Sequence, residues 1–159
     1  MTSGQPGWRS FLFILGLLSA PVIGLWAEAP TVEHIFPAGF TRGSTNAVTI
    51  AGKFEPWPPK VWVSCPGVVF IAETNKGKFR VETKADAPMG AHWLRVFNDD
   101  GPSLPRIFVV AGGAEVLETE PNDHFTNAQP VTPLPMTVNG RLDKSGDVDS
   151  FAVTLKAGQ

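Results

Sequence analysis

Two short stretches, Lys78-Phe79-Arg80-Val81-Glu82-Thr83 and His92-Trp93-Leu94-Arg95-Val96-Phe97-Asn98, decide the fold class of this 159-residue chain. In the first stretch the two apolar residues, Phe79 and Val81, point to one side, while the charged residues next to them point to the other. Alternation with a period of two is typical of a β-strand that buries one face. No stretch between residues 30 and 111 shows a sustained helical period. The sequence therefore predicts an all-β fold.

Similar stretches recur about every ten residues, separated by clusters of Gly, Pro, Asn and Asp that favour turns. The 16 Gly and 15 Pro make up nearly a fifth of the chain, against a background of roughly 12%. The seven expected strands are Thr31–Phe36, Ala47–Ala51, Lys60–Ser64, Val68–Glu73, Lys78–Thr83, His92–Asn98 and Arg106–Val110. This spacing predicts an immunoglobulin-like β-sandwich over residues 30–111.

Three motifs in this region carry a family resemblance. They are the opening from Pro30 to Gly39, the stretch Val48-Thr49-Ile50-Ala51-Gly52-Lys53-Phe54, and the late strand from Gly90 to Asn98. Together they resemble the IPT/TIG immunoglobulin-like domains of secreted and surface proteins. The resemblance implies a spacer or adhesive module without catalytic residues.

The N-terminus resembles an export signal. Arg9 precedes an apolar run of 16 residues that ends at Trp26, and Ala27-Glu28-Ala29 offers small residues at the spacing that signal peptidase prefers. The run is shorter than the roughly 20 residues that cross a bilayer as a helix. We expect a signal peptide over residues 1–29, with cleavage after Ala27 as the fallback, and a permanent anchor as the weaker alternative. The chain is therefore expected to be exported: secreted, periplasmic or on the cell surface.

Acidic side chains crowd into two places in the C-terminal part of the chain. The six candidate metal ligands are Glu118, Glu120, Asn122, Asp123, Asp147 and Asp149. Crowded carboxylates repel one another unless a cation or solvent compensates, and calcium takes six to eight oxygen ligands. An EF-hand counted from Asp143 fails, because Val148 and Thr154 occupy the places of its Gly and Glu. Two readings remain open: a calcium site, or a solvated turn in which Asp and Asn cap backbone groups.

The same residues carry a second resemblance. The motif from Glu118 to Asp123, followed by Gly140-Arg141-Leu142 and by the stretch from Gly146 to Phe151, is similar to the start of a bacterial pre-peptidase C-terminal (PPC) domain. That domain is a β-sandwich appended to secreted peptidases and other exported proteins. Some collagen-binding relatives hold calcium with the acidic entry motif and a later Asp pair, so the resemblance implies calcium as a cofactor at the six residues above.

The second sandwich is expected to be incomplete. A sandwich of this type needs about seven strands, and 42 residues remain from Glu118, with one clear alternating strand at Phe151–Leu155. We therefore divide the chain into a signal peptide (1–29), an immunoglobulin-like sandwich (30–111), a linker (112–117) and a truncated PPC-like sandwich (118–159). The apolar residues expected to lack a covering sheet are Val138, Leu142, Phe151, Val153 and Leu155.

Composition and motifs give little sign of catalysis. The net charge of −2 offers no basic excess for a phosphate backbone, so no nucleic-acid partner is expected. The common nucleophile, zinc-protease, phosphate-binding and dinucleotide-binding motifs are absent. The three histidines are isolated, and Cys65 is expected to be an unreactive thiol at a strand end. Trp57, between two prolines, is expected to lie exposed in a loop, where it could stack on sugar or protein, and Trp62 and Trp93 to pack inside.

We expect a non-catalytic exported or cell-surface protein built of β-sandwich modules, acting in binding or spacing. Its partners would be protein or polysaccharide at the cell surface or in the matrix, with no membrane contact after signal cleavage. The alternative is the N-terminal accessory region of a secreted hydrolase, most plausibly a peptidase, whose catalytic domain lies beyond residue 159.

Overall fold

The computed structural model describes Met1 and residues 28–158. The predicted signal peptide thus lies outside the described residues, apart from its two ends. The described residues contain no helix long and apolar enough to span a bilayer. Their regular structure consists of strands alone, which confirms the predicted all-β class.

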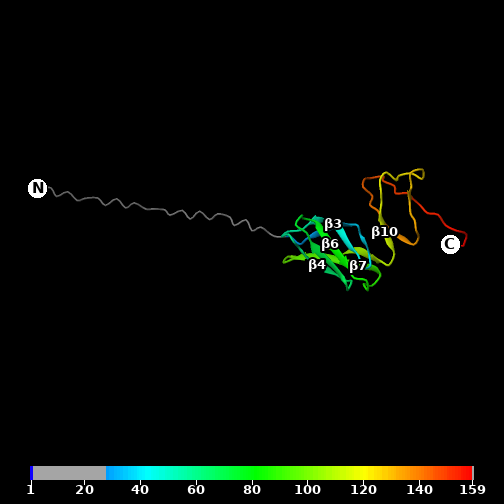
Figure 1. Ribbon diagram of the computed structural model, residues 1–159. Coiled ribbons are helices and arrows are strands. Elements are labelled where there is room, and N and C mark those ends of the chain that lie inside the picture. The colour runs from blue at the N-terminus through cyan, green and yellow to red at the C-terminus, as the bar shows by residue number, and fades with distance from the viewer. Residues whose placement is uncertain (2–27, 159) are drawn as a thin grey trace.

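Residues 31–111 form two packed sheets, labelled in part in Figure 1. One sheet has the order β1-β3-β6-β5, with all pairs antiparallel. The other has the order β2-β9-β7-β4, in which β2 pairs parallel with β9 and the short β8 pairs with β7. The strands are β1 (Thr31–Phe36), β2 (Gly39–Thr41), β3 (Thr45–Lys53), β4 (Lys60–Val63), β5 (Val68–Ala72), β6 (Lys78–Thr83), β7 (Gly90–Asn98), β8 (Gly101–Pro102) and β9 (Arg106–Ala111).

This strand order is that of an immunoglobulin-like sandwich. In the usual letters, β1-β3-β6-β5 corresponds to A-B-E-D, and β4-β7-β9 corresponds to C-F-G. All seven expected strands are present, with ends that differ by at most two residues. The sequence reading missed β2 because Gly39 belonged to a turn cluster, and only its pairing with β9 makes this three-residue segment a strand.

The core lies between the two sheets and is made by the inward members of each alternating strand. Phe40, Phe70 and Phe108 meet with ring centroids 5.5–5.8 Å apart, and Phe79 joins them at 6.2 Å from Phe70. Leu94 and other inward residues are fully buried beside them. Each such side chain contributes about 1.5–3 kcal/mol through the hydrophobic effect. The alternation seen in the sequence is therefore what closes the sandwich.

Gly52 allows β1 and β3 to approach each other beside a β-bulge between Val32 and His34. Its φ is +150°, and a Cβ placed on it would lie 1.9 Å from the carbonyl oxygen of Thr31. A side chain at this position would displace the backbone of β1.

The tryptophans contradict the expectation from the sequence. Trp57 is half-buried: its ring lies 5.3 Å from that of Phe79, and its indole nitrogen donates to the carbonyl of Glu73 at 3.1 Å. Trp62 and Trp93 are 50% and 47% exposed. The prediction was wrong because both lie at the outward positions of β4 and β7, whose inward neighbours fill the core.

Residues 112–158 form a smaller lobe beside one end of the sandwich, yellow to red in Figure 1. Its strands are β10 (Ala114–Leu117), β11 (Gln129–Pro130), β12 (Met136–Asn139) and β13 (Phe151–Ala152), paired in parallel as β10-β12 and β11-β13. The segment expected as a linker thus holds β10, which pairs within the lobe. Of the strand expected over Phe151–Leu155, only Phe151 and Ala152 are paired, with Gln129 and Pro130 of β11.

The lobe contacts the sandwich through named polar groups. The amide of Gly39 donates to Oδ1 of Asn139 at 2.7 Å, and the hydroxyl of Thr41 donates to the carbonyl of Gly113 at 3.0 Å. A Cβ on Gly39 would lie 2.8 Å from the Asn139 oxygen, so this contact needs glycine. These bonds fix β10 and β12 against β2.

Candidate cation site in the C-terminal lobe

Three of the predicted ligands come together in the lobe. One carboxylate oxygen from each of Glu118, Glu120 and Asp149 lies within 4.8 Å of the other two. Glu118 and Glu120 follow the end of β10, and Asp149 precedes β13. The amide of Gln129 donates to the carbonyl of Ser150 at 2.9 Å, which holds the chain beside Asp149 in place. Segments distant in the sequence thus form one acidic corner.

The end of β12 closes this corner. The backbone amide of Glu118 donates to the carbonyl of Asn139 at 3.0 Å, and the amide of Arg141 donates to Oε1 of Glu118. A Cβ on Gly140, between them, would lie 2.7 Å from Oε2 of Glu118 and 3.4 Å from Oδ2 of Asp149. The sequence reading did not include Gly140 in the site. A glycine directly after a short strand, which can mark a close approach, was the available signal.

Asn122 is buried next to this acidic corner in the chain. It is 0% exposed. Its backbone amide donates to Oε2 of Glu120 at 2.9 Å, and its backbone carbonyl accepts from the backbone amide of Ser150 at 3.0 Å. The backbone therefore holds Asn122 next to both Glu120 and the Asp149 segment. Neither polar atom of its side chain has a hydrogen-bond partner among the residues that the structure describes.

Buried oxygens without a hydrogen-bond partner among the described residues gather in this corner. Besides Asn122, Oε2 of Glu118 and Oδ1 of Asp149 are buried and unpartnered. Leaving such a group without a hydrogen bond costs about 1–3 kcal/mol, and more when it is charged. Burial raises the pKa of Glu118, the negative charges of Asp149 and Glu120 raise it further, and the Arg141 amide offsets part of the effect. A bound cation would satisfy these oxygens and oppose the charge repulsion.

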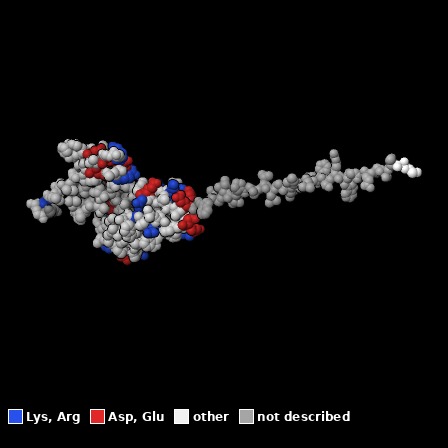
Figure 2. Space-filling model, turned by 180° about the vertical axis from the view of Figure 1, so that it is seen from behind, with Lys and Arg blue, Asp and Glu red and all other residues white. Residues whose placement is uncertain are grey.

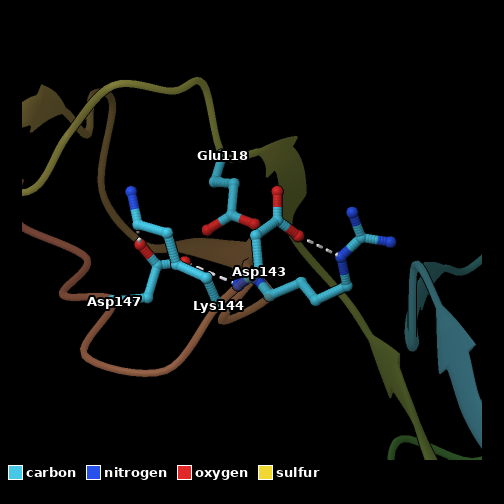
Figure 3. Close-up of polar contacts among 5 residues, drawn as sticks. Glu118, Asp143, Lys144 and Asp147 are labelled. Atoms are coloured by element: carbon cyan, nitrogen blue, oxygen red, sulfur yellow. Dashed lines mark hydrogen bonds and ion pairs between the residues drawn. The ribbon is translucent and has the colours of Figure 1, made fainter.

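The structure places the other two predicted ligands outside this group. Asp123 is exposed. Asp147 accepts a hydrogen bond from the amide of Asp143 at 2.5 Å and lies 4.0 Å from Nζ of Lys144 (Figure 3). Its side chain is 2% exposed and already has partners, so it caps the loop that follows Arg141.

The remaining chemically active side chains occupy structural positions. The ring of His92 packs 5.6 Å from Phe108, and its Nε2 lies 2.8 Å from the carbonyl of Pro88. His124 bonds to Thr126 within its own turn. Cys65 is buried, and this burial raises the pKa of its thiol, which favours the unreactive protonated form.

Comparison with known proteins leaves the family open. No family model matches the chain, and no curated protein matches it. One solved structure is similar, a chimeric titin Z1Z2 functionalized with a KLER exogenous peptide from decorin, at 20% identity and a TM-score of 0.32. The match covers 54% of this chain and 97% of that chain. The fold described above rests on strand order and not on this similarity.

Proposed function

We propose that this chain is a non-catalytic, exported binding and spacing protein, whose C-terminal lobe takes up a calcium ion. The immunoglobulin-like sandwich is the rigid element, because nearly all buried apolar residues lie in it. The lobe is the element whose stability would depend on calcium. Its ion would be held by Glu118, Glu120, Asn122 and Asp149.

The observation that carries the calcium proposal is the set of buried oxygens without partners. Three carboxylates and one amide supply the hard oxygen ligands that calcium prefers, and water can complete its shell of six to eight. Magnesium fits less well, because it requires near-ideal octahedral geometry and retains most of its water. Bound calcium would stabilise the lobe by offsetting the burial of Glu118 and Asp149.

Hydrogen exchange with mass spectrometry tests the proposal in both parts of the molecule at once. In excess calcium, compared with chelator, amides of residues 114–152 should exchange more slowly, and those of residues 31–111 should not change. Calcium at 100 times its Kd stabilises the form that binds it by about 2.7 kcal/mol, so protection should rise up to about 100-fold. Identical exchange in the two buffers would refute the site.

Matched variants separate calcium binding from general charge effects. Glu118→Gln and Asp149→Asn keep the shape of each side chain and remove a negative charge, so each should abolish the calcium response. Asp86→Asn changes an exposed acid of the sandwich and should leave the response intact. A response that survives Glu118→Gln and Asp149→Asn would assign the ion to another place.

A second candidate function is supported by the PPC-like motif from Glu118 to Phe151. In that case the chain is an accessory region of a secreted hydrolase, most plausibly a peptidase. Reading the coding sequence beyond residue 159 distinguishes the two: a protease motif supports the accessory region, and further β-modules support the binding and spacing protein.

A further inference from the structure

The outward face of the β2-β9-β7-β4 sheet is apolar along three of its strands. Trp62 on β4, Trp93 on β7 and Ile107 on β9 are 50%, 47% and 51% exposed, and Val109 is 38% exposed. Trp93 lies directly opposite Ile107 in the ladder, and Ala91 lies opposite Val109. We call these five residues, with Arg95, the tryptophan face. A contiguous exposed apolar face of this kind marks an interaction site.

One unpaired cation lies in the tryptophan face. Arg95 is directly opposite Trp62 and is half-buried. Among the described residues it has neither a hydrogen bond nor an ion pair. The outward positions of β4, β7 and β9 hold no carboxylate. Trp and Arg in one patch are typical anchors of protein interfaces. The partner that fits this face would therefore present a carboxylate, to pair with Arg95, beside an apolar side chain.

The C-terminal lobe presents such a pair at its tip. Phe125 is 79% exposed, and Asp123, two residues earlier, is exposed and has no hydrogen bond or ion pair within the described residues. The segment from residue 112 holds seven acidic and three basic side chains. Figure 2 shows acidic side chains on this lobe, with basic side chains beside them. Asp123 therefore offers the carboxylate that the tryptophan face lacks.

The tip is already ordered for docking. Asn127 closes the turn: its side-chain oxygen accepts from the amide of His124 at 2.9 Å, and its side-chain nitrogen donates to the carbonyl of Pro121 at 3.1 Å. The rings of His124 and Phe125 lie 4.2 Å apart. Little conformational entropy would be lost when this corner binds, which favours association.

We propose that the tryptophan face binds the Asp123–Phe125 corner of a second copy of this chain. The Asp123 carboxylate pairs with the guanidinium of Arg95, and the Phe125 ring packs on Trp62 and Trp93. If the tryptophan face of each copy binds the Asp123–Phe125 segment of the other, the two copies form a closed dimer. If each copy binds the next in one direction only, they form an open chain of copies. The contact does not depend on calcium, because the side chain of Asn127 holds the Asp123–Phe125 segment in place.

Sedimentation velocity of the purified protein at up to about 0.5 mM, in calcium and in chelator, tests this proposal. The mass should rise above that of a monomer as concentration increases. Trp93→Ser, Arg95→Glu and Asp123→Lys should each weaken association at least about tenfold. The controls are Val69→Ser and Asp86→Lys, which should leave association unchanged. Val69 lies on β5 in the other sheet, and its side chain is 51% exposed. A protein that stays monomeric throughout overturns the proposal.

A mixture of two charge-reversed variants identifies the contact itself. Arg95→Glu alone and Asp123→Lys alone place like charges together. Mixed, they restore opposite charges between unlike copies, so association should return to within about threefold of the wild type. If Trp93→Ser abolishes association but the charge reversals have no effect, the face meets a different surface, and the assigned corner is wrong. Association in calcium but not in chelator would also contradict the stated contact, because it would show that the Asp123–Phe125 segment needs the ion.

Discussion

The sandwich and the C-terminal lobe differ in what they bury: mostly apolar side chains in the sandwich, and mostly unpartnered polar atoms in the lobe. Of the sixteen buried apolar residues in the described part of the chain, fifteen lie in the sandwich and one, Val131, lies in the lobe. Conversely, six buried side-chain polar atoms have no hydrogen-bond partner within residues 28–158; five of them lie in the lobe, and one, on Thr83, lies in the sandwich. The sandwich is stabilised by apolar burial, whereas the lobe holds buried polar atoms that have no hydrogen-bond partner among the described residues. The residues that stabilise the fold and the residues of the candidate cation site therefore lie in different regions of the chain.

The lobe also leaves apolar side chains in water, as the sequence led us to expect. Leu142, Phe151, Val153 and Leu155 are all exposed, and Val138 alone of the expected five is half-buried. Two-residue and four-residue strands in separate pairs enclose too little volume to cover them. The lobe should accordingly open at a lower free energy than the sandwich.

The same leucine truncation made in both regions should show the largest difference. Leu94→Ala removes a fully buried side chain and should destabilise the sandwich by about 2–5 kcal/mol. Leu142→Ala changes a side chain that is 67% exposed and should cost less than about 0.5 kcal/mol. Denaturant unfolding followed by tryptophan fluorescence measures the first directly, since Trp57, Trp62 and Trp93 lie in the sandwich and residues 112–159 contain no tryptophan. Equal costs would break the comparison between the two regions.

A glycine pair should give the next largest contrast. Gly52→Ala introduces a side chain at a φ of +150° against the backbone of Thr31, and should destabilise the sandwich by about 2–3 kcal/mol. Gly146 also has a positive φ, of +82°, but nothing lies within 4 Å of its Cβ position. Gly146→Ala should therefore cost only about 1 kcal/mol, through local strain, and should be visible in exchange of the lobe. A smaller loss in Gly52→Ala than in Gly146→Ala would reject the close approach of β1 and β3.

Two buried asparagines in the lobe should respond in opposite directions. Asn122→Leu removes two buried polar atoms without partners, so in chelator it should stabilise the lobe by about 1–3 kcal/mol and remove the calcium response. Asn139→Leu removes the acceptor of the Gly39 amide and should destabilise the lobe by a similar amount. Exchange rates of residues 129–131 and 150–152 report both effects. Destabilisation by Asn122→Leu in chelator would mean that the Asn122 side chain is already satisfied.

The smallest expected effect is a pH dependence at the contact between lobe and sandwich. Burial raises the pKa of Glu115 above its ordinary value of about 4.3, and its hydrogen bond from Asn139 offsets part of this shift. The folded state therefore favours the protonated acid, so this contribution to stability is complete below the ordinary pKa and is lost as pH rises through the folded one. Glu115→Gln should match the wild type at low pH and exceed it near pH 7. Parallel stability curves for the two proteins would exclude this contribution.

The fold was largely predictable because strand formation depends on local alternation. Phe79 and Val81 indicate one buried face whatever their partners are, and the turn clusters mark where each strand ends. β2 was not predictable, because Gly39–Thr41 becomes a strand only through its parallel pairing with β9. The exposed positions of Trp62 and Trp93 were missed for a related reason: residue type favours burial, but strand parity placed both on the outer face.

The candidate site was predictable in its residue types and only in part in its membership. Acidic spacing pointed to Glu118, Glu120, Asn122 and Asp149, but gave no reason to separate them from Asp123 and Asp147. That separation depends on two hydrogen bonds. The amide of Ser150 donates to the carbonyl of Asn122, across 28 residues of chain, and the amide of Asp143 donates to the side-chain carboxylate of Asp147 within one loop. Spacing along the chain cannot report which way a loop turns.

The amino-acid order alone determined that this protein is made of β-strands, where most of them begin and end, and which apolar residues of the sandwich are buried, because a period of two is a property of neighbours. Only the tertiary structure decided which strand faces look outward, that Gly140 lies against two carboxylates, and that Asp123 is free while Asp149 joins Glu118. These outcomes depend on contacts between distant segments, whose free energy no local pattern contains.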